Sequence, residues 1–126
     1  MIRLHHFGIP IPAGSEEQAF DFYSRMPGFT HVPKPPDLHL DGGLWFQLID
    51  GRQIHLQVDI PLPEDSRTHP AFLVEDLDDL ANLLATREII LEWDELWRNT
   101  RRFKIRDPFG NILEFIDAHQ TTHPLP

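Results

Sequence analysis

Alternating hydrophobic positions divide the chain into eight short strands, and two stretches have helical spacing. Successive side chains of a strand face opposite sides of a sheet, so an apolar residue at every second position predicts a strand with one buried face. On this pattern we expect strands at residues 2–11, 29–32, 44–49, 52–59, 69–74, 89–93, 102–106 and 111–117. Apolar residues at helical spacing predict one helix between Ser15 and Pro27 and another over 76–86. The order is therefore βαβββ, present twice.

Two turn sequences join the strands that end each repeat. Asp50-Gly51 is a strong hairpin signal between two apolar runs. In the second half the turn is Asp107-Pro108-Phe109-Gly110-Asn111, where proline pre-sets φ and where glycine and asparagine accept a positive φ. Each half is therefore expected to finish with a hairpin.

Potential metal ligands recur at matching places in the two halves. His6 opens the first repeat and His69 opens the second. A ligand-type residue, His55 or Glu114, stands four residues after the glycine of each hairpin turn. A single strand histidine is usually an ordinary polar residue, but four such residues in equivalent positions favour a shared site.

Glu114 is the residue whose surroundings most require a partner. Ile112 and Ile116 share its face of the predicted strand, so the carboxylate points from a mostly buried surface. A carboxylate there needs a cation, a hydrogen-bond network or a metal. Gly8 and Ala71, two residues after each opening histidine, are small and leave space in front of the sheet.

Composition and charge restrict the possible partners. The 126 residues suffice for one domain, and the absence of cysteine leaves His, Asp and Glu as metal ligands. A net charge of −9 argues against nucleic acid and against an anionic membrane surface, so a small molecule is the expected partner. The chain shows no signal sequence and no apolar run of about 18 residues, and we expect a cytoplasmic location by default.

A duplicated βαβββ unit with these ligand positions resembles the vicinal oxygen chelate superfamily, which includes glyoxalases, bleomycin-resistance proteins and dihydroxybiphenyl dioxygenases. The resemblance covers residues 2–117 and is carried by LHHFGIPI, AFDFYSRMPGF, THPAFLVEDLDDL and RDPFGNILEFID. It implies one α+β domain over residues 1–126. In that domain module one (1–60) and module two (68–118) form a cup-shaped mixed sheet, with helices on its outer face and a tail at 119–126.

The resemblance also implies how the site is assembled. Family members of this size usually dimerise so that each site takes one module from each chain. Carried over to this sequence, His6 and His55 of one chain would meet His69 and Glu114 of the other around one divalent metal. Zn, Ni, Mn and Fe all suit such ligands.

Charge counting indicates the chemistry that such a site favours. Glyoxalase I-type members pair two histidines with two glutamates, whereas here His55 occupies the second carboxylate position. With all four residues bound, the two charges of the ion less one carboxylate leave +1, which makes the ion a strong Lewis acid. We expect a lyase or isomerase that acts on a small oxygen-chelating substrate through a metal-stabilised enediolate, with Glu114 moving the proton.

Two alternatives stay open. If His55 does not bind, then His6, His69 and Glu114 form a two-histidine, one-carboxylate site that resembles thiol transferases and dioxygenases of the same superfamily. Ring cleavage is disfavoured because Tyr23, the one tyrosine, lies in the first predicted helix, on its apolar side. The other alternative is a non-catalytic binder of the bleomycin-resistance type, in which the cup holds a ligand without metal.

Four further residues are candidates for contact with a substrate. They lie on equivalent strands of the two modules: Trp45, Gln47, Arg102 and Lys104. Phe103 and Ile105 are expected on the helix side of the second of these strands, which puts Lys104 on the open side. The two cations could hold an anionic substrate group.

Overall fold

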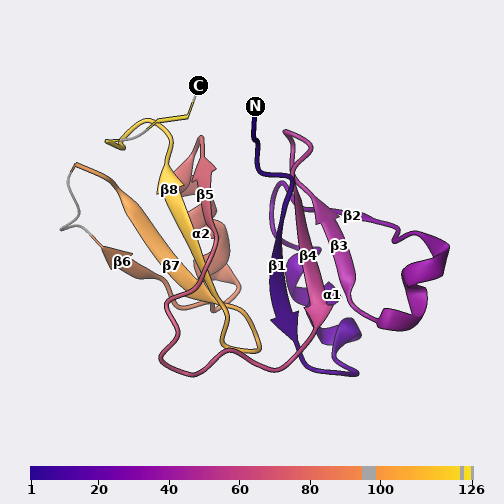
Figure 1. Cartoon of the computed structure of the whole chain (residues 1–126). Helices are drawn as coiled ribbons and strands as arrows, with labels where there is room; N and C mark the ends of the chain where they lie inside the picture. The colour runs from indigo at the N-terminus through magenta and orange to yellow at the C-terminus, as the bar shows by residue number, and fades with distance from the viewer. Residues whose placement is uncertain (95–98, 123, 126) are drawn as a thin grey trace. The chain divides into compact units, whose positions relative to one another are not determined.

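The computed structural model describes residues 1–94, 99–122 and 124–125. The chain divides into two compact units, Met1–Ser66 and Arg67–Pro126 (Figure 1). Each unit is a four-stranded mixed sheet with a helix, so the predicted α+β class and the predicted order βαβββ are confirmed. The predicted loop 94–100 and tail 119–126 lie partly outside the described residues. No helix among those residues is long and apolar enough to cross a membrane.

The sheet of the first unit has the order β1-β4-β3-β2, in which β1 runs parallel to β4 and the other pairs are antiparallel. Its elements are β1 His6–Ile11, α1 Glu16–Tyr23, β2 Thr30–Val32, the 3-10 helix η1 Pro36–Asp41, β3 Leu44–Gln47 and β4 Gln53–Val58. The proline and glycine content of residues 33–43 predicts a loop there, and η1 lies within this range. Proline at the first position of η1 fits a helical turn, because it has no N–H to satisfy there.

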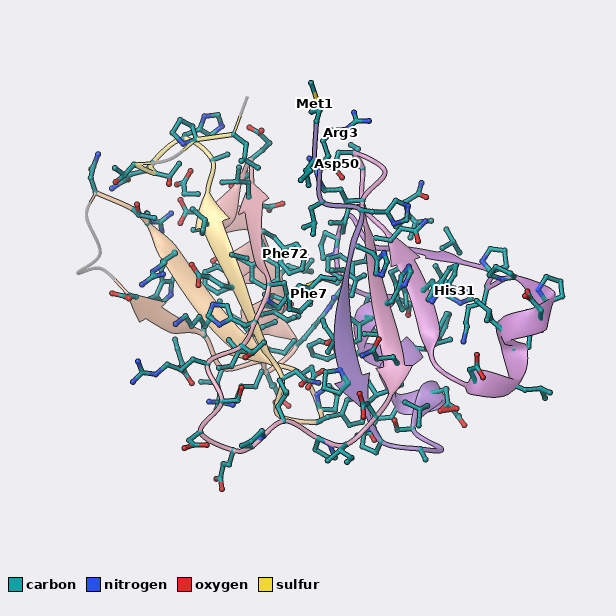
Figure 2. The ribbon with its side chains drawn as sticks, viewed as in Figure 1. Met1, Arg3, Phe7, His31, Asp50 and Phe72 are labelled. Carbon is teal, nitrogen blue, oxygen red and sulfur yellow. The ribbon has the colours of Figure 1, made fainter. Side chains whose placement is uncertain are left out.

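The first strand begins four residues later than the predicted range 2–11. His6 is opposite Gln53, the first residue of β4. The carbonyl of His5 still accepts the N–H of Gln53 at 2.9 Å, but the residues before His5 lie beyond the end of β4. They run beside the turn that precedes β4, where Met1, Arg3 and Asp50 are seen together (Figure 2). The strand predicted at 44–49 likewise ends at Gln47, because residues 48–51 form that turn.

The sheet of the second unit repeats the topology, with the order β5-β8-β7-β6 and a parallel pair β5 and β8. Its elements are β5 Ala71–Val74, α2 Leu77–Thr86, β6 Glu92–Asp94, β7 Arg102–Arg106 and β8 Ile112–Asp117. The strand predicted at 89–93 is shifted towards Asp94. The reason is that Ile89 N–H donates to the Leu84 carbonyl at 3.1 Å, which extends the end of α2 over the start of the predicted strand.

Strand β5 also begins later than the predicted range 69–74, which leaves His69 just before the strand. Pro70 has no N–H, but its carbonyl accepts the N–H of Glu114 at 3.1 Å. Pro70 therefore accepts a hydrogen bond from β8 but donates none to it. His69 is held beside the end of the sheet rather than within a strand.

Each helix packs on one face of its own sheet, and that face forms the core of the unit. The buried strand residues are Ile9, Ile11, Phe46, Ile54 and Leu56 in the first unit and Phe103, Ile105, Leu113 and Phe115 in the second. Tyr23 is fully buried on α1, as predicted. The alternate strand positions face away from the helix, and these carry the candidate site residues.

The register of the two parallel pairs confirms the internal repeat. Gly8 lies opposite His55 on β1 and β4, and Ala71 lies opposite Glu114 on β5 and β8. Each ligand-type residue thus has a small residue beside it, two positions after the opening histidine. The turn before β8 is fixed by Asp107, whose Oδ1 accepts the N–H groups of Phe109 and Asn111, both at 2.8 Å.

Candidate metal centre

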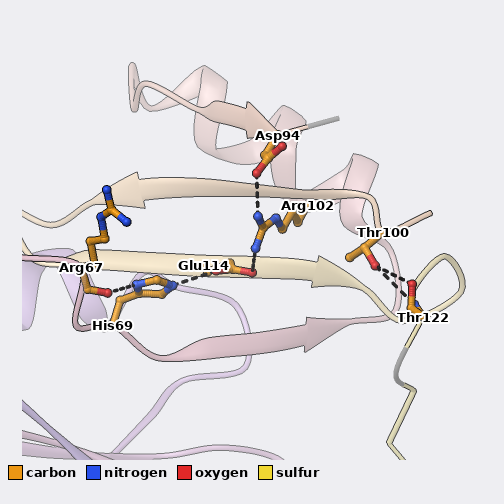
Figure 3. A network of polar contacts seen from close by, with 7 residues as sticks. All are labelled: Arg67, His69, Asp94, Thr100, Arg102, Glu114 and Thr122. Carbon is orange, nitrogen blue, oxygen red and sulfur yellow. Dashed lines mark hydrogen bonds and ion pairs between the residues drawn. The ribbon is translucent and has the colours of Figure 1, made fainter. Parts of the chain in front are cut away.

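The second unit brings His69 and Glu114 into direct contact. The distance from His69 Nε2 to Glu114 Oε1 is 2.7 Å, and the Glu114 side chain is only 5% exposed (Figure 3). His69 Nδ1 lies 2.6 Å from the carbonyl oxygen of Arg67, which can only accept, so Nδ1 carries a proton. In a neutral ring Nε2 then has a lone pair directed at a carboxylate oxygen. The two atoms are at hydrogen-bond distance, and both are of kinds that bind divalent metal ions.

The other oxygen of Glu114 is held by Arg102. One guanidinium nitrogen, Nη1, is 3.0 Å from Glu114 Oε2, and the other, Nη2, is 2.6 Å from Asp94 Oδ2 (Figure 3). Burial disfavours the charged guanidinium, but the hydrogen bonds and charges of Asp94 and Glu114 outweigh it and raise the pKa of Arg102. Both carboxylates therefore face a permanent cation.

The first unit brings together His6 and His55 as a stacked pair. Their ring centroids are 4.1 Å apart with an angle of 14° between the planes, and Trp45 stacks on His55 at 4.1 Å and 5°. His55 Nε2 is 2.8 Å from the amide oxygen of Gln53 and donates to it, so Nδ1 carries the lone pair. His6 has its own neighbour, His5, with 3.0 Å between the two Nδ1 atoms.

The environment of His55 keeps its ring neutral. Burial lowers the pKa of His55 from 6.5 to about 4, and the charges of His6, His5 and Lys34 act in the same direction. A neutral imidazole retains the lone pair that a metal or a substrate proton requires.

The candidate residues therefore form one pair in each unit. No three His, Asp or Glu side chains gather as a metal-binding group among residues 1–94, 99–122 and 124–125. The set His6, His55, His69 and Glu114 stays a prediction that requires the two pairs to meet.

The predicted substrate residues have different surroundings. Trp45 lies against His55, and Gln47 accepts from Gln53 Nε2 at 3.4 Å. Arg102 is 14% exposed and is held between two carboxylates. Lys104 lies opposite Glu114 in the strand register and has no ion-pair partner in the part of the chain that the structure describes.

Asp94 was missed by the sequence analysis, which placed it in a loop after a strand ending at residue 93. In the structure Asp94 is the last residue of β6 and lies opposite Arg102. An acidic residue opposite a basic one on the neighbouring strand would have indicated this pair. Recognising it requires the correct strand range, 92–94, which depends on where the preceding helix ends.

The neutrality of His55 can be tested in the metal-free protein by following its ring protons in an NMR pH titration. We expect a pKa of about 4. The unfolded chain takes up this proton near pH 6.5, so the free energy of unfolding should fall between pH 6.5 and about 4 and change no further from this group below that. Trp45→Ala should expose the ring and raise the pKa, whereas Trp93→Ala, in the other sheet, should not. A wild-type pKa near 6.5 would contradict this account.

No protein-family model matches the sequence, and no curated protein matches it. Solved structures do match. A glyoxalase family protein from Bacillus anthracis is 33% identical, with 93% of this chain and 95% of that chain covered and a TM-score of 0.85.

Two more distant structures share the fold. Lactoylglutathione lyase from Agrobacterium tumefaciens is 20% identical over 92% of this chain and 93% of that chain, with a TM-score of 0.70. A mutant of the fosfomycin resistance protein FosX from Listeria monocytogenes, complexed with Mn(II) and 1S,2S-dihydroxypropylphosphonic acid, is 16% identical over 97% of this chain and 95% of that chain, with a TM-score of 0.76. With its repeated βαβββ units and its similarity to the Bacillus protein along nearly the whole length, this chain belongs to the glyoxalase family of the vicinal oxygen chelate superfamily.

Proposed function

We propose that this protein is a metal-dependent, glyoxalase-type enzyme that acts as a lyase or isomerase on a small substrate with two neighbouring oxygen atoms. The observation that carries the proposal is the 2.7 Å approach of His69 Nε2 to Glu114 Oε1, with the far side of each group already bound. Two facing acceptors whose outer atoms are fixed have the form of a prepared cation site.

The donor set fits a divalent first-row ion. His69 Nε2 and Glu114 Oε1 would bind it from the second module, and His6, at the equivalent place in the first module, would add a further nitrogen. Imidazole and carboxylate ligands suit Zn, Ni, Mn and Fe. The Mn(II) complex of the Listeria protein, which shares the fold, supports the same class of ion.

The chain's own residues supply the remaining chemistry. When bound, the ion would polarise the oxygens of the substrate as a Lewis acid. Glu114, the carboxylate of the donor set, would take the proton from the carbon beside the carbonyl and return it to the former carbonyl carbon, with the hydroxyl proton passing to the other oxygen, while Arg102 remains the partner of Oε2. Lys104, beside Glu114 on the open face, would bind an anionic group of the substrate, and Trp45 and Gln47 would line the other side.

The stacking of His6 and His55 supports a second candidate function. A metal binds an imidazole nitrogen in the plane of the ring at about 2 Å. Two rings whose planes are 14° from parallel share no in-plane point so close to both. This favours the three-ligand set His6, His69 and Glu114 of a thiol transferase or dioxygenase, with His55 as a neighbour of the site.

Metal analysis tests the proposed function directly. Protein purified without added ions, then titrated with Zn, Ni, Mn and Fe(II), should bind one ion per site. His69→Ala or Glu114→Ala should weaken binding by more than the roughly 10–100-fold that loss of a supporting partner costs, because each removes a ligand. The measurement is the dissociation constant from calorimetry, with the bound metal confirmed by elemental analysis.

His119→Ala is the matched control for this experiment. His119 Nε2 lies 2.9 Å from Glu75 Oε2, so it forms the same kind of pair, but the two side chains are 72% and 85% exposed. Its removal should leave metal binding unchanged. Wild-type protein that binds none of the four ions would overturn the proposal of a metal-dependent enzyme. The alternative of a non-catalytic protein that binds a small molecule without metal would then remain.

His55→Ala shows whether the proposed site has four ligands or three. With four ligands, the variant should lose affinity as severely as His69→Ala. With three ligands, it should keep most of its affinity, because only a neighbouring ring is lost. We expect the second result on the stacked geometry, and the dissociation constant of the variant relative to wild type decides.

We further propose a homodimer in which each site takes one module from each chain. A chain with His6→Ala retains a complete second module, and a chain with Glu114→Ala retains a complete first module. Co-expressed with different tags, the two should form mixed dimers that bind one ion each, although neither variant binds alone. Mixed dimers that stay metal-free would place each site within a single chain.

A further inference from the structure

We infer that Arg102 is a positioning residue for Glu114, anchored by Asp94, and does not bind the substrate. The inference deepens the proposed function, because it concerns how one ligand of that site is held. It begins from a chain of contacts across three neighbouring strands: Asp94 on β6, Arg102 on β7 and Glu114 on β8 (Figure 3).

The strand register explains why a long forked side chain is needed. Asp94 lies directly opposite Arg102, but Glu114 lies opposite Lys104, two positions further along β7. The link from Arg102 to Glu114 is therefore a diagonal one. The guanidinium spans both with separate nitrogens, Nη2 to Asp94 and Nη1 to Glu114, whereas a lysine has one nitrogen for two carboxylates.

Burial makes this arrangement selective for a single orientation of Glu114. The side chains of Arg102 and Glu114 are 14% and 5% exposed, so neither has ready access to water as a substitute partner. With Oε2 held by Arg102, Oε1 is the oxygen that faces His69 Nε2. A cation at this point would thus meet one carboxylate oxygen, not two.

The same contacts leave Arg102 unsuited to hold a substrate. Its charge already faces two carboxylates, and a substrate anion would have to displace one of them from a poorly hydrated position. Lys104 has no ion-pair partner among the described residues and lies beside Glu114 on the same face. An anionic substrate group is therefore assigned to Lys104.

The first module has no arginine in the position equivalent to Arg102. When the register of β3 and β4 is continued by one residue, the position equivalent to Arg102 is Gly43, which has no side chain. His55 is held by ring stacking and by Gln53 instead. Arg102 thus belongs to the module that supplies the carboxylate.

The test compares Arg102→Gln, Arg102→Lys and Asp94→Asn with Arg101→Gln as the matched control. Arg101 also pairs with two carboxylates, Asp78 and Asp117, but it does not contact Glu114. If Arg102→Gln lost metal affinity only because the fold is weakened, Arg101→Gln should lose a similar amount. Circular dichroism and thermal unfolding of all four variants check that each remains folded.

The first readout is Co(II) binding by the full chain. Arg102→Gln should weaken it by about 10–100-fold and change the visible spectrum, because a released Glu114 can turn and bind through both oxygens. Arg102→Lys should recover part of the affinity and Asp94→Asn should lose less than Arg102→Gln. Arg101→Gln should keep both the affinity and the spectrum of the wild type.

The second readout needs no metal. The ¹⁵N shift of His69 Nε2, measured at fixed pH in the metal-free protein, should move in Arg102→Gln and stay in place in Arg101→Gln. Unchanged shift and affinity in Arg102→Gln, or equal losses in the two variants, would overturn the inference. Wild-type protein that binds no Co(II) would instead overturn the proposed function, and the His69 resonance would still decide the role of Arg102.

Discussion

The buried carboxylate of Glu114 is the constraint on which the site depends. It stands in the middle strand pair of the second sheet, where water cannot satisfy it, so the protein must supply partners for both oxygens. His69 faces one oxygen and Arg102 the other. Removing one partner of a buried ion pair typically costs about 3–5 kcal/mol, so the neighbours of such a group are under strong constraint.

The two halves of the protein hold the ligand-type residue at the equivalent position in different ways. The backbone register is shared, with a small residue opposite each ligand-type side chain. The first half places a neutral imidazole there and holds it between aromatic rings. The second half places a charge there and holds it with other charges. One fold thus holds the ligand-type residue by ring stacking in one unit and by ion pairs in the other.

Membership of the glyoxalase family fixes the architecture and leaves the reaction to the side chains. Folds of this kind host varied chemistry, so the argument for function has to come from the site. Here the proposed function rests on the contact of His69 with Glu114, an imidazole and a carboxylate, which are ligand types that suit a divalent ion.

The sequence by itself determined the order of the elements, the internal repeat and the small residue two positions after each opening histidine. These follow from period-two alternation and turn residues, which act over a few neighbouring positions. Only the tertiary structure decided where strands begin, because a strand needs a partner: β1 starts at His6, opposite the first residue of β4. The same holds for the contacts of Asp94, Arg102 and Glu114 and for the stack around His55, which depend on side-chain directions across several strands and are not encoded in local spacing.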